Sequence, residues 1–246
     1  MTTERRFENS YNNWERAESY ARLEFTGTYY LAYRDLPAII FKHVTGKRAV
    51  DFGCGAGRST RFLRKLGFEA VGIDISAEMI EKAQALDPVG DYRIVSDGDY
   101  DQVGQRQFDL VLAVFTFDNI PSAENRANLL RALKRLLRPG GKIILLDSTP
   151  ELYGLDWVSF STSHFPENHR KTSGSIVKTI IEGIGDNRPV EDIFWTDADY
   201  RALFEAAGLE LVESYRPLAI KSEPYDWINE TKVAPWVIYV VRITES

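Results

Sequence analysis

The sequence predicts an α/β fold in which a mostly parallel, doubly wound sheet has helices on both faces. Short apolar runs alternate with amphipathic stretches between Arg48 and Ser148, which is the pattern of strands joined by helices in a parallel sheet. The runs are rich in Val, Ile and Leu without polar alternation, as expected for strands covered on both faces. With 246 residues, 44% of them hydrophobic, the chain is long enough for one sizeable core, and we expect a single domain.

The predicted elements follow in order along the chain. Five strands are expected at 49–52, 70–74, 92–95, 110–114 and 142–147, with a helix at about 58–66 between the first two. The clearest helix starts after Ser122, a good N-cap, carries leucines on one stripe, and stops at the turn Pro139-Gly140-Gly141. Thr196 is the expected N-cap of a helix at 197–207, and strands are expected at 209–215 and 237–243.

Two regions lie outside this alternation. Residues 1–47 are rich in Tyr, Trp and Glu and are expected to form helices before the first strand, including one at 35–44. Residues 150–192 interrupt the pattern, and the runs 176–181 and 190–194 are expected to pair as an added hairpin around a turn-prone segment.

Composition excludes several classes of protein. A net charge of -6 argues against a broad phosphate-binding surface, so no nucleic acid partner is expected. The longest apolar runs are far too short to cross a bilayer and the start MTTERRFENS lacks a signal-peptide core, so we expect no membrane association and a cytoplasmic location. Cys54 is the single cysteine, which excludes an internal disulfide and clustered thiolate zinc sites; no metal site is predicted.

The stretch VDFGCGAGR, from Val50 to Arg58, puts glycines 53, 55 and 57 directly after the first strand. Glycine allows positive φ and close approach of a ligand, so this turn is a candidate cofactor site. The dinucleotide fingerprint Gly-x-Gly-x-x-Gly requires glycine where this chain has Arg58, so the register does not fit a nicotinamide cofactor. Asp51 would repel a pyrophosphate but suits a cationic ligand such as S-adenosylmethionine, which carries an ammonium and a sulfonium and no phosphate.

With these residues the sequence resembles a class I S-adenosylmethionine-dependent methyltransferase. The resemblance covers Arg48 to about Ser148 well and the last two strands more loosely, and it rests also on VGIDIS, SDGD, FDLVLAVFTF and LLRPGGKIILLD. It implies a Rossmann-like, seven-stranded sheet, mostly parallel with an antiparallel last strand. The single domain would consist of an N-terminal helical cap (1–47), a cofactor-binding core (48–149), an insertion or lid after strand 5 (150–192), and a C-terminal helix and strands (193–246).

The resemblance implies that the glycine loop holds the methionine part of the cofactor. Asp74, which ends the second strand, would accept hydrogen bonds from the ribose hydroxyls, and Asp97 would lie near the adenine amino group. Arg22 is a further candidate because its planar guanidinium suits a carboxylate. The expected cofactor-binding residues are Asp51, Gly53, Cys54, Gly55, Gly57, Asp74, Ile75, Asp97, Gly98, Val114, Phe115 and Thr116, with Tyr20, Arg22 and Tyr30 at the methionine end. The product would be S-adenosylhomocysteine.

Methyl transfer mainly requires alignment of the reactants, because the sulfonium is already activated, and a base only where the acceptor is protonated. His164 in STSHFPENHR is the first candidate base and Asp118 in FTFDNIP the second; an exposed loop histidine without a catalytic role is the competing interpretation. The fourth-strand exit lacks the Asn/Asp-Pro-Pro-Tyr/Phe motif of enzymes that methylate planar amide or base nitrogens. Aromatic residues of the N-terminal region and the insertion would roof a small-molecule pocket, with simple core packing as the alternative.

The predicted function is methyl transfer from S-adenosylmethionine to an O or N atom of a small-molecule acceptor. A protein or RNA methyltransferase and a noncatalytic S-adenosylmethionine-binding module stay open as alternatives, and a nicotinamide-dependent oxidoreductase is disfavoured by the glycine register. The identity of the acceptor and the choice between a monomer and a homodimer do not follow from the sequence.

Overall fold

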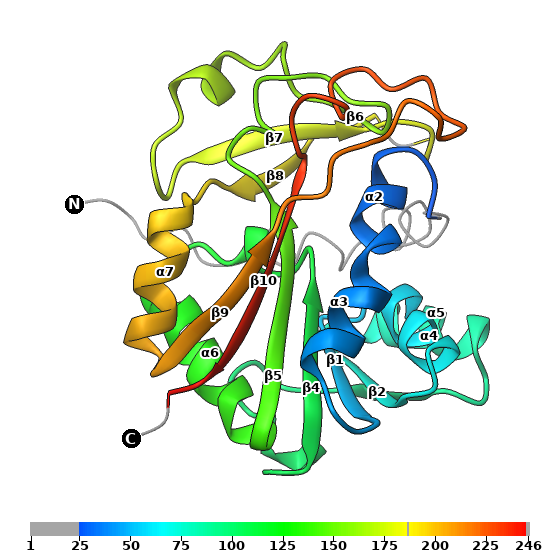
Figure 1. Ribbon diagram of the computed structural model, residues 1–246, viewed down its shortest axis with the longest axis vertical. Coiled ribbons are helices and arrows are strands. Elements are labelled where there is room, and N and C mark those ends of the chain that lie inside the picture. Colours follow the sequence, from blue (N-terminus) through cyan, green and yellow to red (C-terminus); the bar gives the residue numbers. More distant parts are fainter. Residues whose placement is uncertain (1–24, 186, 245–246) are drawn as a thin grey trace.

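A computed structural model describes residues 25–185 and 187–244, built on a seven-stranded sheet of order β3-β2-β1-β4-β5-β10-β9 (Figure 1). Neighbouring strands from β3 to β5 are parallel, and β10 is antiparallel to both β5 and β9. The strands are β1 (Arg48–Phe52), β2 (Glu69–Asp74), β3 (Asp91–Ile94), β4 (Phe108–Val114), β5 (Leu137–Ser148), β9 (Leu209–Tyr215) and β10 (Trp236–Ile243). The predicted Rossmann-like sheet with an antiparallel last strand is confirmed.

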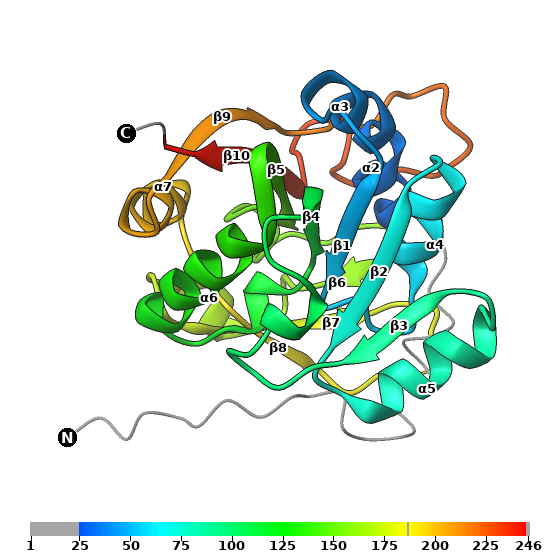
Figure 2. The ribbon, with the colours of Figure 1, turned by 90° about the horizontal axis from the view of Figure 1, so that it is seen from below.

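Helices cover both faces of this sheet. Figure 2 shows α2, α3 and α4 on one face and α6 and α7 on the other. Two buried apolar clusters, one on each face, fill the space between the sheet and these helices. The helices are α2 (Thr28–Arg34), α3 (Leu36–His43), α4 (Arg58–Lys65), α5 (Ala77–Leu86), α6 (Ala123–Leu136) and α7 (Asp197–Ala206), with short 3-10 turns η1 (Asp101–Val103), η2 (Phe117–Asn119) and η3 (Pro166–Arg170).

The predicted N-caps fix the starts of two helices. Ser122 Oγ accepts a 3.0 Å hydrogen bond from the Asn125 amide at the start of α6. Thr196 and Asp199 form a capping box at the start of α7, in which each side chain accepts a hydrogen bond from the other residue's amide. These bonds satisfy amides that a helix leaves without partners in its first turn.

Some predicted boundaries were wrong. The turn at Pro139-Gly140-Gly141 was expected to precede a strand at 142–147, but β5 already begins at Leu137, directly after α6. Leu137 pairs with Phe108 of β4, and the register then shifts before Lys142 pairs with Leu110. Pro139, Gly140 and Gly141 therefore lie inside β5, at an irregularity in its pairing with β4. The third strand, expected at 92–95, lies one residue earlier, at Asp91–Ile94. The helix expected at 35–44 is one residue shorter at each end, Leu36–His43.

The insertion forms a second, three-stranded antiparallel sheet of order β6-β7-β8, which lies across the end of the main sheet at which β5 finishes (Figure 1). The predicted hairpin is present as β7 (Ile176–Ile181) and β8 (Val190–Ile193). The two-residue strand β6 (Phe160–Ser161) pairs with the end of β7 and was not predicted.

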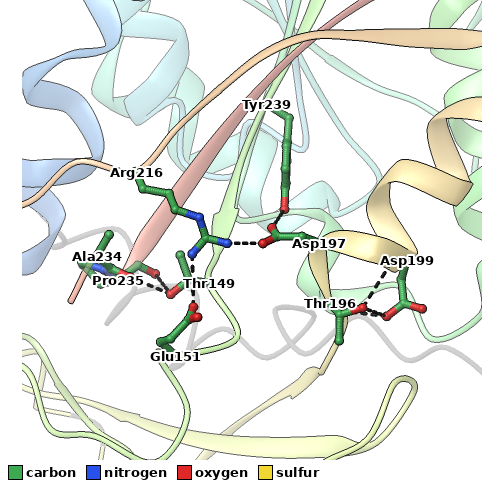
Figure 3. Close-up of polar contacts among 9 residues, drawn as sticks. All are labelled: Thr149, Glu151, Thr196, Asp197, Asp199, Arg216, Ala234, Pro235 and Tyr239. Carbon is green, nitrogen blue, oxygen red and sulfur yellow. Dashed lines mark hydrogen bonds and ion pairs between the residues drawn. The ribbon is translucent and has the colours of Figure 1, made fainter.

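Arg216, just after β9, joins the insertion to the main sheet (Figure 3). Its guanidinium forms ion pairs with Asp197 at the start of α7 and, at 3.1 Å, with Glu151 at the start of the insertion. The Tyr239 hydroxyl of β10 donates a hydrogen bond to Asp197. The side chains thereby link three separate segments beside the point where the chain leaves β5.

Across the two described stretches of chain, no helix is long and apolar enough to cross a membrane. Within the same residues, no group of three or more His, Cys, Asp or Glu side chains is placed to hold a metal ion.

Candidate cofactor site

The glycine loop between β1 and α4 has a backbone that requires glycine. Gly53, Gly55 and Gly57 have φ values of 66°, 52° and 80°, in the left-handed region that side chains with a Cβ disfavour. A Cβ on Gly53 would lie 2.5 Å from Thr116 Oγ1, and one on Gly57 would lie 2.7 Å from the Tyr92 ring. The loop therefore packs tightly against the exit of β4 and against β3.

The middle of the loop is open instead. A Cβ on Gly55 would meet nothing nearer than Met79 Sδ at 3.9 Å. The Gly55 amide donates a 2.9 Å hydrogen bond to Asp74 Oδ2, and the Ser76 amide donates one of 2.9 Å to Asp74 Oδ1. Asp74 ends β2, the parallel neighbour of β1, so the carboxyl ends of the two strands bring the loop and this carboxylate together. Burial raises the pKa of Asp74, and these amide hydrogen bonds oppose that shift.

Asp51 lies behind the loop rather than facing the space in front of it. It is fully buried, and its Oδ2 accepts 2.6 Å hydrogen bonds from the hydroxyls of Ser59 and Thr60 in the first turn of α4. Burial raises the pKa of Asp51 to about 6. Its Oδ1 has no hydrogen-bond partner among the described residues. The carboxylate thus fastens the end of β1 to the start of α4.

A cavity of about 520 Å³ lies in front of the loop, at the carboxyl ends of the parallel strands. Most residues predicted to bind the cofactor line it together: Gly53, Cys54, Gly55, Asp74, Ile75, Asp97, Gly98, Val114, Phe115 and Thr116. Asp51 and Gly57 are not among the lining residues, and Tyr30 packs elsewhere, against Tyr225. Tyr20 and Arg22 lie outside the residues that the structure describes.

Asp97 and Gly98, in the turn after β3, also line the cavity. The Tyr100 hydroxyl donates a 2.9 Å hydrogen bond to Asp97 Oδ1, which fixes the carboxylate. Gly98 has a φ of 83°, and no atom lies within 4 Å of the position that its Cβ would take. The turn at Gly98 therefore leaves room for a flat group to lie against its backbone.

Sequence reasoning missed Arg58, the first residue of α4, which also lines the cavity. Its guanidinium lies 4.9 Å from the centroid of the Tyr29 ring and 5.5 Å from that of Tyr33, within cation–π distance. The sequence feature that could have identified Arg58 is its position directly after Gly57, where a cation faces a ligand bound by the glycine loop. Polar residues of α6, among them Asn128 and Arg131, line the cavity as well and gave no recognisable motif.

The two candidate bases lie in different places. His164 is in the insertion; its Nδ1 lies 3.1 Å from Ser161 Oγ and its ring packs on Phe165, and it lines neither this cavity nor the next. Asp118 is buried on η2 and accepts hydrogen bonds from the amide and hydroxyl of Ser148, at 3.2 and 2.7 Å. It lines a second cavity, of about 40 Å³.

Phe115 and Asn119 line both cavities, so the second adjoins the first. Phe115 has a φ of 56°, which is strained for a residue with a bulky side chain, and such strain concentrates at functional sites. The Asn119 side-chain amide donates a 3.3 Å hydrogen bond to the Phe115 carbonyl. The exit of β4 is thus held in an unusual conformation at the boundary between the two cavities.

Several known methyltransferases are similar to this chain in sequence or fold. The chain is 25% identical over 166 residues to N-demethylindolmycin N-methyltransferase of Streptomyces griseus, a match covering 66% of this chain and 69% of that protein. It is 30% identical over 118 residues to a ubiquinone biosynthesis O-methyltransferase of Xanthomonas oryzae, a match that spans only 46% of this chain and 48% of that relative.

A solved S-adenosylmethionine-dependent methyltransferase from Clostridium acetobutylicum has the same fold, with a TM-score of 0.63 at 12% identity; the match covers 96% of this chain and all of that one, 100%. A family model described as a methyltransferase domain matches residues 25–214. The chain therefore belongs to the methyltransferase domain family, and within it to the class I S-adenosylmethionine-dependent methyltransferases.

Proposed function

We propose that the chain transfers the methyl group of S-adenosylmethionine to an O or N atom of a small molecule. The observation that carries this proposal is the large cavity in which the open glycine loop and the Asp74 carboxylate face the same space. The names of the relatives support a small acceptor, since they act on indolmycin and ubiquinone precursors. The net charge of -6 also favours a small molecule over a nucleic acid.

The residues present fit the proposed cofactor. The loop leaves room for a ligand at Gly55, where an added Cβ would project into open space. Asp74 supplies acceptor oxygens for the ribose hydroxyls, and Ile75 an apolar surface for the adenine. Arg58 supplies a cation for the methionine carboxylate, the role that the sequence had suggested for Arg22.

The remaining residues align the reactants and exclude water. The bound cofactor supplies a methyl group already activated by its sulfonium. Phe115 and Asn119 line both cavities, so they fix the direction from which an acceptor approaches. Asp118 lies on the acceptor side of these two residues, within the second cavity, and is better placed than His164 to receive a proton.

Calorimetry tests the cofactor and labelling tests the reaction. We expect S-adenosylmethionine and S-adenosylhomocysteine to bind one per chain, and NADH not to bind. Methyl-labelled cofactor should transfer label to small amines or phenols. Label found instead in protein or RNA fractions would favour the macromolecular alternative, and binding without transfer to any acceptor would favour the noncatalytic module.

We also propose a cytoplasmic location and a monomeric or homodimeric state, as the sequence led us to expect. Cell fractionation and light scattering of the purified protein test these two points directly.

A further inference from the structure

The second cavity has an aromatic wall built from four separate segments. Tyr29 of α2, Phe115 after β4, Phe160 of β6 and Trp236 of β10 all line it (Figure 1 shows these elements). The centroids of Phe115 and Trp236 are 4.6 Å apart, those of Tyr29 and Phe160 4.9 Å, and those of Phe160 and Trp236 5.4 Å. We call these four residues the aromatic box.

The rest of the lining includes polar and acidic side chains. Asp118 of η2 and Asp192 of β8 both line the cavity, and β8 packs against η2. The Tyr153 hydroxyl donates a 3.1 Å hydrogen bond to Asp192 Oδ2. Thr179 of β7 also lines the cavity; it is 3% exposed, and its hydroxyl has no hydrogen-bond partner among the described residues. A buried hydroxyl without a partner is costly, so this one points to a ligand.

Carboxyl groups outnumber cations around this part of the lining. A third carboxylate, Asp147 of β5, is fully buried near Asp118, and neither of its oxygens has a hydrogen-bond partner among the described residues. Arg126 of α6 is the nearby cation, and it donates hydrogen bonds to the Ile120 carbonyl and the Tyr200 hydroxyl. Burial and the Asp118 charge raise the pKa of Asp192 to about 8, as expected where carboxylates gather without enough cations.

We propose that the second cavity receives the attacking nitrogen of an amine acceptor, which enters as an ammonium between the aromatic box and the carboxylates of Asp118 and Asp192. This inference rests on the proposed methyl transfer and names its substrate class. Aromatic faces and carboxylates both attract a cation, whereas a neutral hydroxyl gains little from either. At about 40 Å³, the cavity suits a small nitrogen-bearing group rather than a whole molecule.

The reaction balances with these residues. The bound ammonium favours the ionised form of Asp192, so the proton that Asp192 carries in the free protein passes to solvent. The ammonium then loses one proton to Asp192 rather than to Asp118, whose Oδ2 already accepts two hydrogen bonds from Ser148. The freed lone pair on nitrogen forms a bond to the methyl carbon of S-adenosylmethionine. The carbon–sulfur bond breaks and its electron pair stays on sulfur, which leaves the thioether S-adenosylhomocysteine. The methylated nitrogen carries the positive charge and departs as an ammonium, or passes a further proton to water. The hydroxyl of Thr179, which also lines the cavity, can accept a hydrogen bond from the ammonium.

Calorimetry on full-length protein saturated with S-adenosylhomocysteine tests the inference. We expect benzylamine and phenethylamine to bind at least tenfold more tightly than benzyl alcohol and phenethyl alcohol, which have the same shape without the charge. Asp192→Asn should weaken amine binding at least tenfold and leave alcohol binding unchanged. Thr179→Val, which keeps the side-chain shape, should weaken amine binding severalfold and provides a second variant should Asp192→Asn fold poorly.

Glu191→Gln is the matched control. Glu191 precedes Asp192 in β8, and successive strand residues point to opposite faces, so its replacement should leave the amine preference unchanged. Alcohols binding as tightly as amines, no amine binding at all, or an undiminished amine preference in both Asp192→Asn and Thr179→Val would each overturn the inference. Failure to bind S-adenosylhomocysteine in the first step would instead refute the proposed function itself.

Discussion

The main-chain amide of Gly55 donates a 2.9 Å hydrogen bond to Asp74 Oδ2, which joins the glycine loop to the end of the neighbouring strand β2. The second carboxylate oxygen is held by the Ser76 amide. The loop and the carboxylate are therefore already in position before a ligand arrives, and a ligand that uses Asp74 does not have to order it first.

Replacement of Asp74 by Ala should weaken S-adenosylmethionine binding at least tenfold, or about 1.4 kcal/mol, because both the ribose acceptor and the anchor of Gly55 are lost. Isothermal titration calorimetry measures this directly. Asp91→Ala removes a carboxylate that pairs with Arg93 at the surface of β3 and serves as the control. Equal affinity of the Asp74 variant and the wild type would contradict the site assignment.

Replacement of Gly53 by Ala should lower the free energy of unfolding more than replacement of Gly140 by Ala. Both glycines have positive φ, so both variants bear backbone strain. Only at Gly53 would the new Cβ meet a neighbour, Thr116 Oγ1 at 2.5 Å, whereas Gly140 has nothing within 4 Å. The collision should add about 1–3 kcal/mol of destabilisation. Urea unfolding of the two variants gives the difference, and similar values for both would show that the loop relaxes freely.

The stability of Asp192→Asn relative to the wild type should depend on pH. Burial and Asp118 raise the pKa of Asp192 from 3.8 to about 8, while Tyr153 and Arg126 act in the opposite direction. The folded state therefore keeps a proton that the unfolded chain releases, and rising pH lowers the stability of the wild type between these two values.

Asparagine cannot ionise, so the stability advantage of the variant should grow steadily from pH 5 to pH 8. Chemical unfolding at a series of pH values measures it. A difference between variant and wild type that stays constant with pH would mean that Asp192 titrates normally in the folded protein.

Cys54 should react slowly with thiol reagents in the folded protein. Burial and the charges of Asp51 and Asp74 raise the pKa of its thiol well above the ordinary value. Because the thiolate is the reactive form, each unit of pKa lowers its fraction about tenfold, so the Ellman reaction should be at least tenfold slower than in urea. S-adenosylhomocysteine should slow it further, since Cys54 lines the large cavity. The chain has one cysteine, so all label reports on this site, and fast labelling of the folded protein would be the contrary result.

The sequence predicted the parallel part of the sheet because buried strands such as β4 are continuous apolar runs. It did not predict the early start of β5, because Pro139-Gly140-Gly141 is ordinarily a turn and its inclusion in a strand depends on pairing with distant Phe108. The two residues of β6 carry no periodic signal, and only their pairing with β7 makes them a strand.

In the site, too, features set by the local sequence could be predicted, and features set by distant residues could not. Strand-end residues such as Asp74 and Asp97 were predictable, since parallel strands end at one edge of the sheet. The sequence did not predict whether a carboxylate faces that edge or lies behind it. Asp51 lies behind it because its carboxylate accepts hydrogen bonds from two hydroxyls of α4. The second cavity escaped prediction altogether, since it brings together residues as distant in sequence as Tyr29 and Trp236.

The origin of the two cavities has a consequence for how such a chain diverges. Apart from Tyr33 of α2, the walls that face the proposed cofactor come from β1 to β4 and the loops and helices that follow them, whereas much of the second cavity comes from α2, the insertion and β10. Under the proposed function, substitutions in the insertion change which compound is accepted and leave the walls of the large cavity unaltered. Arg216, which joins the start of the insertion to α7 through its ion pairs with Glu151 and Asp197, would hold the insertion in place through such changes.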